Sequence, residues 1–264
     1  MKKFKKYIPY FGWSFFIVLL ILVMGFVKKD REEMLLSEPE IKLEAPENMV
    51  FLTQTDVLNR LRNMHLVWED QKFKELDIDK VELALNGMPE VKSAKVFFRL
   101  DGKWEISCVL REPIVRLIDR NGESFYLDRD KKVMPISRKF SARVIPVTGE
   151  FDKADFVQSQ NIIHNEALIN KNLLDQVYAL SDYVCKDVEL SSLITQIYLT
   201  KEGDFELITL LGDQKVIFGK AEDIPAKFEK LKLFYKYGIP KTGWDNYKEI
   251  NVQYKDQIVC TKKE

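Results

Sequence analysis

Apolar and polar residues alternate along residues 95–111, KVFFRLDGKWEISCVLR, with the two-residue period of a β-ribbon that buries one face. A two-residue Asp-Gly turn would place the two apolar sets on opposite faces, so the loop must hold an odd number of residues. A three-residue loop over residues 100–102 pairs Phe98 with Trp104 and Val96 with Ile106. The pattern therefore predicts a hairpin with a defined register.

Two short helices are predicted before this hairpin. Residues 53–56, TQTD, have the form of a capping box with Thr53 as the N-cap, and apolar residues at helical spacing follow it. A second helix begins near residues 77–79 and ends at residues 86–89, NGMP, where the glycine is expected in the left-handed conformation and the proline forbids continuation. With a strand near residues 48–52, the order of elements is β-α-α-β-β.

The rest of the chain is rich in predicted strands. They cover residues 114–119, 124–128, 133–136, 194–200, 205–211, 214–219, 248–254 and 257–261. Turn residues between the first three predict a meander. A helix is expected over residues 172–186, and the last helix has Asp223 as its N-cap and Pro225 in its first turn, and ends at Gly238 before Pro240.

The N-terminus differs in kind from everything that follows. After the basic residues MKKFKK, residues 7–27 carry no charge, and as a helix they reach about 31 Å, which matches a bilayer. A cleaved secretory signal is the alternative, but this segment is long and lacks a small-residue cleavage site. We expect residues 1–6 in the cytoplasm, a transmembrane signal anchor at residues 7–27 and a charged linker at residues 28–46.

The composition argues against a nucleic-acid role and does not by itself indicate another function. Lys+Arg and Asp+Glu number 41 each, so no overall field attracts phosphate, and no basic run lies outside the N-terminus. The three cysteines, Cys108, Cys185 and Cys260, are scattered and odd in number, which predicts neither a disulfide framework nor a metal site. They are expected as packed apolar residues, and one optional bridge among them stays open.

Candidate catalytic chemistry is sparse. His65 and His164 lack a second His or a Glu at metalloprotease spacing. Residues 241–243, Lys-Thr-Gly, match one element of serine enzymes that act on peptidoglycan, but no Ser in the chain is followed by Lys three residues later. We expect no enzyme activity, no catalytic residue and no cofactor.

An acidic cluster in the meander could suggest a Ca²⁺ site, formed by Asp119, Asp128 and Asp130. Asp favours hairpin turns because it bonds its own backbone, and four basic residues neutralise this cluster. A structural role in the turns is therefore preferred to metal binding.

A docking edge for another protein is the remaining candidate site. A chain that ends on a strand at residues 257–261 can leave a row of unpaired backbone groups, to which an incoming segment adds as a further strand. The alternative is an interior strand with core tyrosines around it. The expected partner-binding residues are Tyr247, Tyr254, Gln257, Ile258, Val259 and Cys260.

These residues together resemble the cell-division protein family FtsQ, called DivIB in Gram-positive bacteria. Residues 87–118 are similar to the end of its POTRA domain, with Arg111, Glu112 and Pro113 at the domain junction. Residues 122–137 are similar to the strand pair that opens its second domain, and residues 140–150, 228–238 and 243–263 resemble the version found in Bacteroidetes. The resemblance covers essentially the whole chain.

The resemblance implies an α+β fold with a single N-terminal transmembrane helix, a POTRA-type β-α-α-β-β domain at residues 47–113 and a β-rich domain with two helices at residues 114–264. It implies a non-enzymatic divisome scaffold of the inner membrane, with its C-terminal domains in the periplasm at the division septum. The implied partners are FtsB and FtsL, which are single-pass coiled-coil proteins, and the septal synthase pair FtsW and FtsI. A peptidoglycan-modifying enzyme and another POTRA-containing assembly factor are the alternatives.

Overall fold

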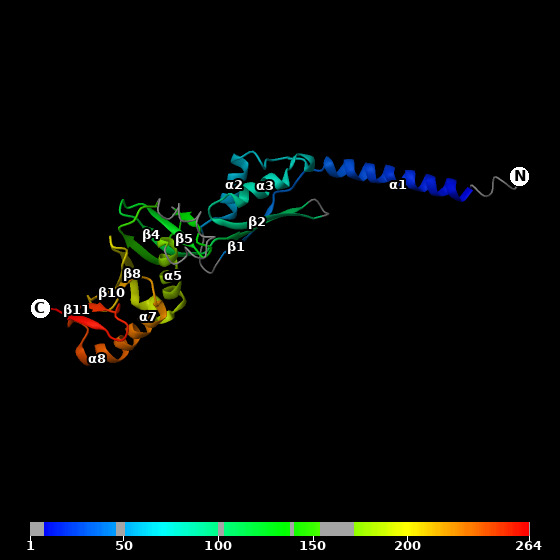
Figure 1. The fold of residues 1–264 in the computed structure, drawn as a ribbon. Helices are drawn as coiled ribbons and strands as arrows, with labels where there is room; N and C mark the ends of the chain where they lie inside the picture. The colour runs from blue at the N-terminus through cyan, green and yellow to red at the C-terminus, as the bar shows by residue number, and fades with distance from the viewer. Residues whose placement is uncertain (1–7, 46–50, 100–102, 138–139, 154–171, 264) are drawn as a thin grey trace. The chain divides into compact units, whose positions relative to one another are not determined.

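The structure is a computed structural model that describes residues 8–45, 51–99, 103–137, 140–153 and 172–263. Within the first helix, the side chains of residues 8–12, 14, 15, 30 and 31 are not described. The chain divides into two compact units, one of residues 1–45 and 52–110 and the other of residues 46–51 and 111–264 (Figure 1). The main division thus falls between Leu110 and Arg111, at the predicted junction.

The first unit has the predicted β-α-α-β-β order. Its elements after the N-terminal helix are β1 (Glu40–Glu44), α2 (Gln54–Asn63), the 3₁₀ turn η2 (Phe73–Glu75), α3 (Ile78–Asn86), β2 (Val91–Phe98) and β3 (Trp104–Leu110). The sheet has the order β1-β3-β2, with β1 parallel to β3. The first strand was predicted near residues 48–52, and this position is wrong: the strand is β1, inside the predicted linker, and the described residues Phe51 and Leu52 belong to no strand. Charged residues alternate with apolar ones in β1, and only Ile41 is buried.

The β2–β3 hairpin has the predicted register. Phe98 pairs with Trp104 and Val96 with Ile106, so the parity argument for an odd loop is confirmed. The loop residues 100–102 themselves lie outside the described residues. Trp104 is 1% exposed, and its indole stacks on Phe98 with ring centroids 5.9 Å apart.

Helix starts were predicted better than helix ends. The capping box is present, since the Thr53 hydroxyl accepts from the Asp56 N–H at 3.2 Å and the Asp56 carboxylate accepts from the Thr53 N–H at 3.2 Å. The left-handed glycine expected at the end of α3 is wrong, because Gly87 has φ −78° and ψ −10° and continues the right-handed turn. Its N–H still reaches Leu83 O at 3.0 Å, and Pro89 follows two residues later.

The N-terminal helix α1 covers Ile8–Glu32. Among the residues that the structure describes, no helix is long and apolar enough to cross a membrane. The span predicted over residues 7–27 is therefore not confirmed by the structure.

The segment after α1, predicted as part of a charged linker, is bound to the first unit. Leu36 N–H donates to Gln71 O at 2.8 Å, and Trp104 Nε1 donates to Ser37 O at 2.7 Å. The Glu33 carboxylate forms ion pairs with Lys72, at 2.6 Å, and with Lys74. This attachment has no signal in the sequence, because its partners lie more than thirty residues away along the chain.

The second unit is built on one sheet with the order β12-β11-β10-β9-β8-β7-β4-β5-β6. Its strands are β4 (Pro113–Ile118), β5 (Ser124–Asp128), β6 (Val133–Pro135), β7 (Ile145–Gly149), β8 (Ile194–Leu199), β9 (Phe205–Thr209), β10 (Lys215–Gly219), β11 (Tyr247–Asn251) and β12 (Val259–Lys262). The predicted meander is β4-β5-β6. Strand β7 was missed because Pro146 argues against a central strand. It is tolerated because pairing with β8 begins only at Val147.

Helices pack on this sheet through an apolar face. They are α5 (Leu173–Lys186), α6 (Val188–Leu193) and α7 (Ile224–Leu233), which continues as the π-turn η4 (Phe234–Gly238) and the short α8 (Ile239–Thr242). Asn172 caps α5 by accepting from Leu174 N–H at 3.1 Å. The last helix was predicted to end at Gly238, but Pro240 lies in the first turn of α8, where its missing N–H costs nothing. The described second unit therefore has more helices than the two predicted.

Glu33 provides a pH test of the attachment after α1. The hydrogen bond from Lys72, followed by that from Lys74, lowers the pKa of Glu33 from 4.5 to about 2. Its ion pairs therefore contribute stability fully above pH 4.5, and this contribution is lost as the pH falls through about 2. We expect a Glu33 titration midpoint near pH 2 by carboxyl ¹³C NMR, and a midpoint close to 4.5 in the Lys72→Ala/Lys74→Ala variant. Lys80→Ala, which removes a pair with Asp77 instead, is the control. A wild-type midpoint near 4.5 would contradict the attachment.

Candidate docking edge

Strand β12 lies at the end of the nine-stranded sheet. It pairs with β11 in antiparallel register, Ile250 opposite Cys260 and Asn251 opposite Val259. Within the described part of the chain no strand pairs with its other side. The interior position that the sequence left open for residues 257–261 is therefore wrong, and the backbone of this edge is available for pairing.

Side chains of the edge alternate between anchoring and exposed roles. Ile258 and Cys260 are half-buried and pack against the core of the second unit. Val259 is 43% exposed, and Gln257 is exposed as well. Four of the predicted partner-binding residues thus divide into two that hold the strand on the sheet and two that face solvent.

The backbone direction along β12 follows from one hydrogen bond. Lys263 N–H donates to Asn246 O at 3.0 Å, on the β11 side. Because backbone groups alternate in direction along a strand, Thr261 and Val259 also face β11. The N–H groups of Cys260 and Lys262 therefore point away from the sheet, where an added strand would meet them.

The two predicted tyrosines have different surroundings. Tyr247 is half-buried and packs against the core, with its ring 5.9 Å from that of Phe234, so its role in partner binding stays a prediction. Tyr254 is 50% exposed, in the loop between β11 and β12. Lys230 of α7 holds this loop by donating from Nζ to Tyr254 O and to Val252 O, the latter at 3.1 Å. The role of Lys230 has no signal in the sequence, because its partners are carbonyl groups of residues distant along the chain.

An apolar groove of about 820 Å³ in the second unit was also missed. It is lined by Glu189, Leu190, Ser192, Leu193, Leu210, Leu211, Glu229, Lys232, Leu233, Tyr235, Lys236 and Trp244. Leu210 is 65% exposed, and Leu211 and Leu233 are about half exposed, so the groove presents large apolar side chains to solvent. Asp213, just after the leucine pair, forms an ion pair with Lys263 at 3.3 Å. This ion pair joins the end of β12 to the turn that follows Leu211.

Tyr235, which lines the groove, is held by a polar network. Gln214 Nε2 donates to the Tyr235 hydroxyl at 3.3 Å, and that hydroxyl donates to Thr209 Oγ1 at 3.4 Å. Burial raises the pKa of Tyr235, so it stays a neutral donor. At the rim, the hydrogen bond to Asp187 raises the pKa of Lys232, which keeps it charged. The groove thus combines an apolar wall with fixed polar groups.

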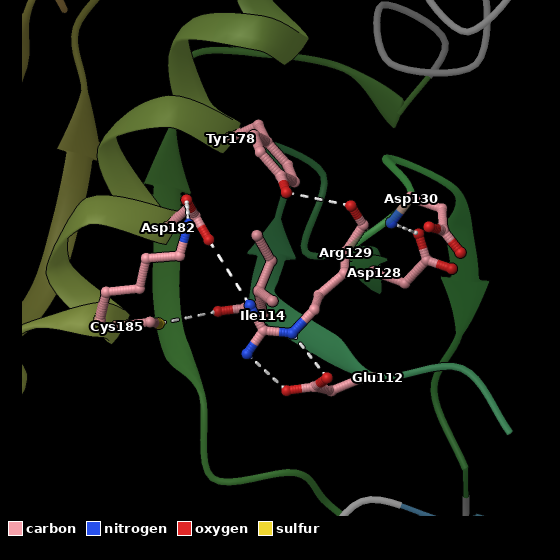
Figure 2. Close-up of polar contacts among 9 residues, drawn as sticks. Glu112, Ile114, Asp128, Arg129, Asp130, Tyr178, Asp182 and Cys185 are labelled. Atoms are coloured by element: carbon pink, nitrogen blue, oxygen red, sulfur yellow. Dashed lines mark hydrogen bonds and ion pairs between the residues drawn. The ribbon is translucent and has the colours of Figure 1, made fainter.

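The predicted junction residues form ion pairs within the second unit. Arg111 Nη1 donates to Asp128 Oδ2 at 2.8 Å, and the Asp128 side chain is 1% exposed. Glu112 binds Arg129 through two hydrogen bonds of 2.6 Å, shown in Figure 2. Pro113 is the first residue of β4, where a missing donor is tolerated.

Figure 2 also shows how helix α5 joins this network. The Tyr178 hydroxyl donates to Arg129 O at 3.0 Å, and Asp182 lies 3.7 Å from the guanidinium of Arg129. Cys185 Sγ donates to Ile114 O at 3.3 Å, and burial of the sulfur raises the pKa of this thiol although the residue as a whole is exposed. The network ties α5 to the start of β4.

Other candidate residues have structural surroundings. Asp128 Oδ1 accepts from the N–H groups of Asp130 and Lys132, and Asp119 Oδ1 accepts from Asn121 and Glu123, so both carboxylates hold their own turns as predicted. In the described residues no group of acidic, His or Cys side chains could hold a metal. Cys108, Cys185 and Cys260 are free thiols. Residues 241–243 close α8, and His164 lies outside the described residues.

Comparison with known families agrees with this two-unit architecture. A POTRA-like domain profile matches residues 37–109, and a profile described as FtsQ/DivIB, C-terminal related, matches residues 112–261, which is more than half of the chain. The chain belongs to the FtsQ/DivIB family. No curated protein matches it. The FtsQ/DivIB family is a non-catalytic scaffold family of cell division, and its domains imply that role here.

The buried ion pair at the start of the FtsQ/DivIB domain makes a stability prediction. Asp128→Ala removes the partner of Arg111 and two turn hydrogen bonds, so it should lower the free energy of unfolding by about 3–5 kcal/mol. Glu112→Ala removes the more exposed pair with Arg129 and should cost less than about 1 kcal/mol. Urea unfolding curves measure both values. Equal losses in the two variants would contradict this ranking.

Proposed function

We propose that this protein is a divisome scaffold that binds FtsB and FtsL in the periplasm, and through them helps to recruit and regulate the septal synthase pair FtsW and FtsI. The single observation that supports this most is the unpaired edge of β12. An extended segment of FtsB adds to this edge as a tenth strand. Main-chain hydrogen bonds then supply affinity, and side-chain contacts supply specificity.

The apolar groove of the second unit supports a partner that has a helical segment as well as an added strand. A coiled-coil protein presents an apolar stripe along each helix, and such a stripe fits a groove with large exposed leucines. Leu210, Leu211 and Leu233 supply this apolar surface, and Lys232 and Glu229 supply charges at its rim. Strand and groove together receive a segment that turns from helix to strand.

The alternatives lack a supporting observation. An enzyme that modifies peptidoglycan would rest on Lys241, which is exposed at the end of the four-residue helix α8. An outer-membrane assembly factor would continue from its POTRA domain into a long β-barrel, whereas this chain has a domain matched to FtsQ/DivIB there.

Membrane anchorage through residues 7–27 is part of the proposal. These residues carry no charge over a length of about 31 Å as a helix. Large apolar side chains of α1 are exposed from Trp13 to Val27, on every side of the helix that is described. The folded units then lie in the periplasm, with residues 1–6 in the cytoplasm.

Proline at Lys262 tests strand addition. This change removes an N–H that faces away from β11, so the sheet keeps its bonds while the incoming strand loses a donor and meets the proline ring. We expect affinity for FtsB to fall about tenfold or more, measured with purified full-length proteins in detergent. Lys262→Ala, which keeps the N–H, should change affinity by less than about twofold.

Two controls distinguish a loss of FtsB binding from misfolding of the variant. The thermal midpoint of Lys262→Pro should stay close to that of Lys262→Ala, because only a solvent-facing donor is lost. A chain ending after Asp256 removes β12 but keeps the buried Ile250 and Val252, and it should lose FtsB in a pull-down. A change at Ile258 is unsuitable, since it packs against the core. Full FtsB binding by Lys262→Pro would rule out pairing at this edge.

Anchorage has its own measurement. We expect the full-length chain to stay in the membrane pellet after extraction with alkaline carbonate, whereas a chain that starts at Lys28 should be soluble, because it lacks the uncharged segment. Recovery of the full-length chain in the supernatant would contradict the anchor without affecting the test of β12.

A further inference from the structure

The outer edge of β2 is expected to favour unwanted pairing with a strand of another chain. With 8 residues, Val91–Phe98, it is the longest strand among the described residues, and it ends the sheet of the first unit. Long edge strands present unpaired backbone groups that invite another strand. Beside this edge Phe97 is 50% exposed. The structure nevertheless gives this edge a partner that is not a strand.

Hydrogen bonding at the hairpin shows which backbone groups face outward. Arg99 N–H donates to Lys103 O at 2.8 Å, toward β3. Because direction alternates along a strand, Lys95 also faces β3, and the backbone groups of Ala94 and Val96 face away from it. These outward groups are the ones that an added strand would bind.

Asn86 binds the outward backbone groups of Ala94 as a peptide group of an added strand would. Ala94 N–H donates to Asn86 Oδ1 at 2.9 Å, and Asn86 Nδ2 donates to Ala94 O at 3.2 Å. A carboxamide has the same donor and acceptor as a backbone amide, so this two-bond exchange reproduces one pair of an antiparallel ladder. Asn86 is the last residue of α3, which Figure 1 shows beside β2.

Glu82 binds the next outward donor, the N–H of Val96. Val96 N–H donates to Glu82 Oε1 at 2.7 Å. Glu82 lies four residues before Asn86, and residues at this spacing share one face of a helix. The neighbouring Val81 and Leu85 are fully buried, so the packing of α3 holds both side chains at the edge.

We propose that α3 closes the β2 edge against strand addition through Asn86 and Glu82, and that this closure keeps two copies of the chain from pairing through β2. The occupant that it excludes is a second copy of this chain. Antiparallel self-pairing about a two-fold axis at Lys95 would set Ala94 opposite Val96 of the copy, and both have outward backbone groups. No other partner strand is needed for such a pair.

The test opens the edge in the full-length chain with Glu82→Ala/Asn86→Ala. Alanine is the better helix former at both positions, so α3 itself is not weakened. Hydrogen exchange at the amides of Ala94 and Val96 should become about tenfold faster or more, as local protection is lost. The amide of Lys95, which faces β3, should keep its protection and serves as the internal control. Glu82→Gln, which keeps the acceptor, should exchange like the wild type.

Pairing is then measured by co-purification of two differently tagged full-length copies from detergent. We expect the double variant to recover several-fold more of the second copy than the wild type or Glu82→Gln. Unchanged exchange at Val96 would overturn the closure. Faster exchange without any gain in pairing would overturn its role against self-association. If Lys95 also loses protection, Glu82→Ala alone answers the same question at Val96, because Asn86 then still holds Ala94.

Discussion

The rest of this structure depends on how each sheet satisfies the backbone groups at its edges. An open sheet has two edges, and each exposes donors and acceptors that either bind something in the molecule or remain available. Among the described residues there are four such edges. At β6 the strand has three residues and ends on Pro135, and at β1 the carbonyl of Ile41 accepts from Gln54 at 2.7 Å. At β2 the side chains of α3 bind the edge, whereas β12 has no comparable cover within the described chain.

The difference between the covered edges and the open edge of β12 agrees with a scaffold that binds its partners through backbone hydrogen bonds. A family without catalysis needs places where other chains bind, and an open strand and an apolar groove offer directional bonds and buried area. The residues that hold β12 are as informative as those it exposes. Ile258 and Cys260 pack the strand against the core, and Lys230 binds the loop before it, so these contacts hold the edge on the sheet.

Ion pairs join elements of this protein that are distant in sequence. Glu33 binds the segment after α1 to η2, and Arg111 begins the second unit by pairing with the buried Asp128. The two differ in energetics, because an exposed pair contributes little while removal of one partner from a buried pair leaves an uncompensated charge. Acidic residues that could have suggested a metal site are engaged in turns and in these pairs.

The sequence by itself determined whatever depends on neighbours within a few residues. The capping box at Thr53, the cap at Asn172 and the parity of the loop between Phe98 and Trp104 were predictable because their geometry is local. Tertiary structure decided the rest. Strand β7 tolerates Pro146 only because β8 begins to pair one residue later, and β1 is recognisable as a strand only beside β3. Whether residues 257–261 form an edge, and whether the edge of β2 is covered by side chains, depends on which distant segments lie alongside. The alternation of apolar residues is the same in either case, so the sequence pattern cannot decide it.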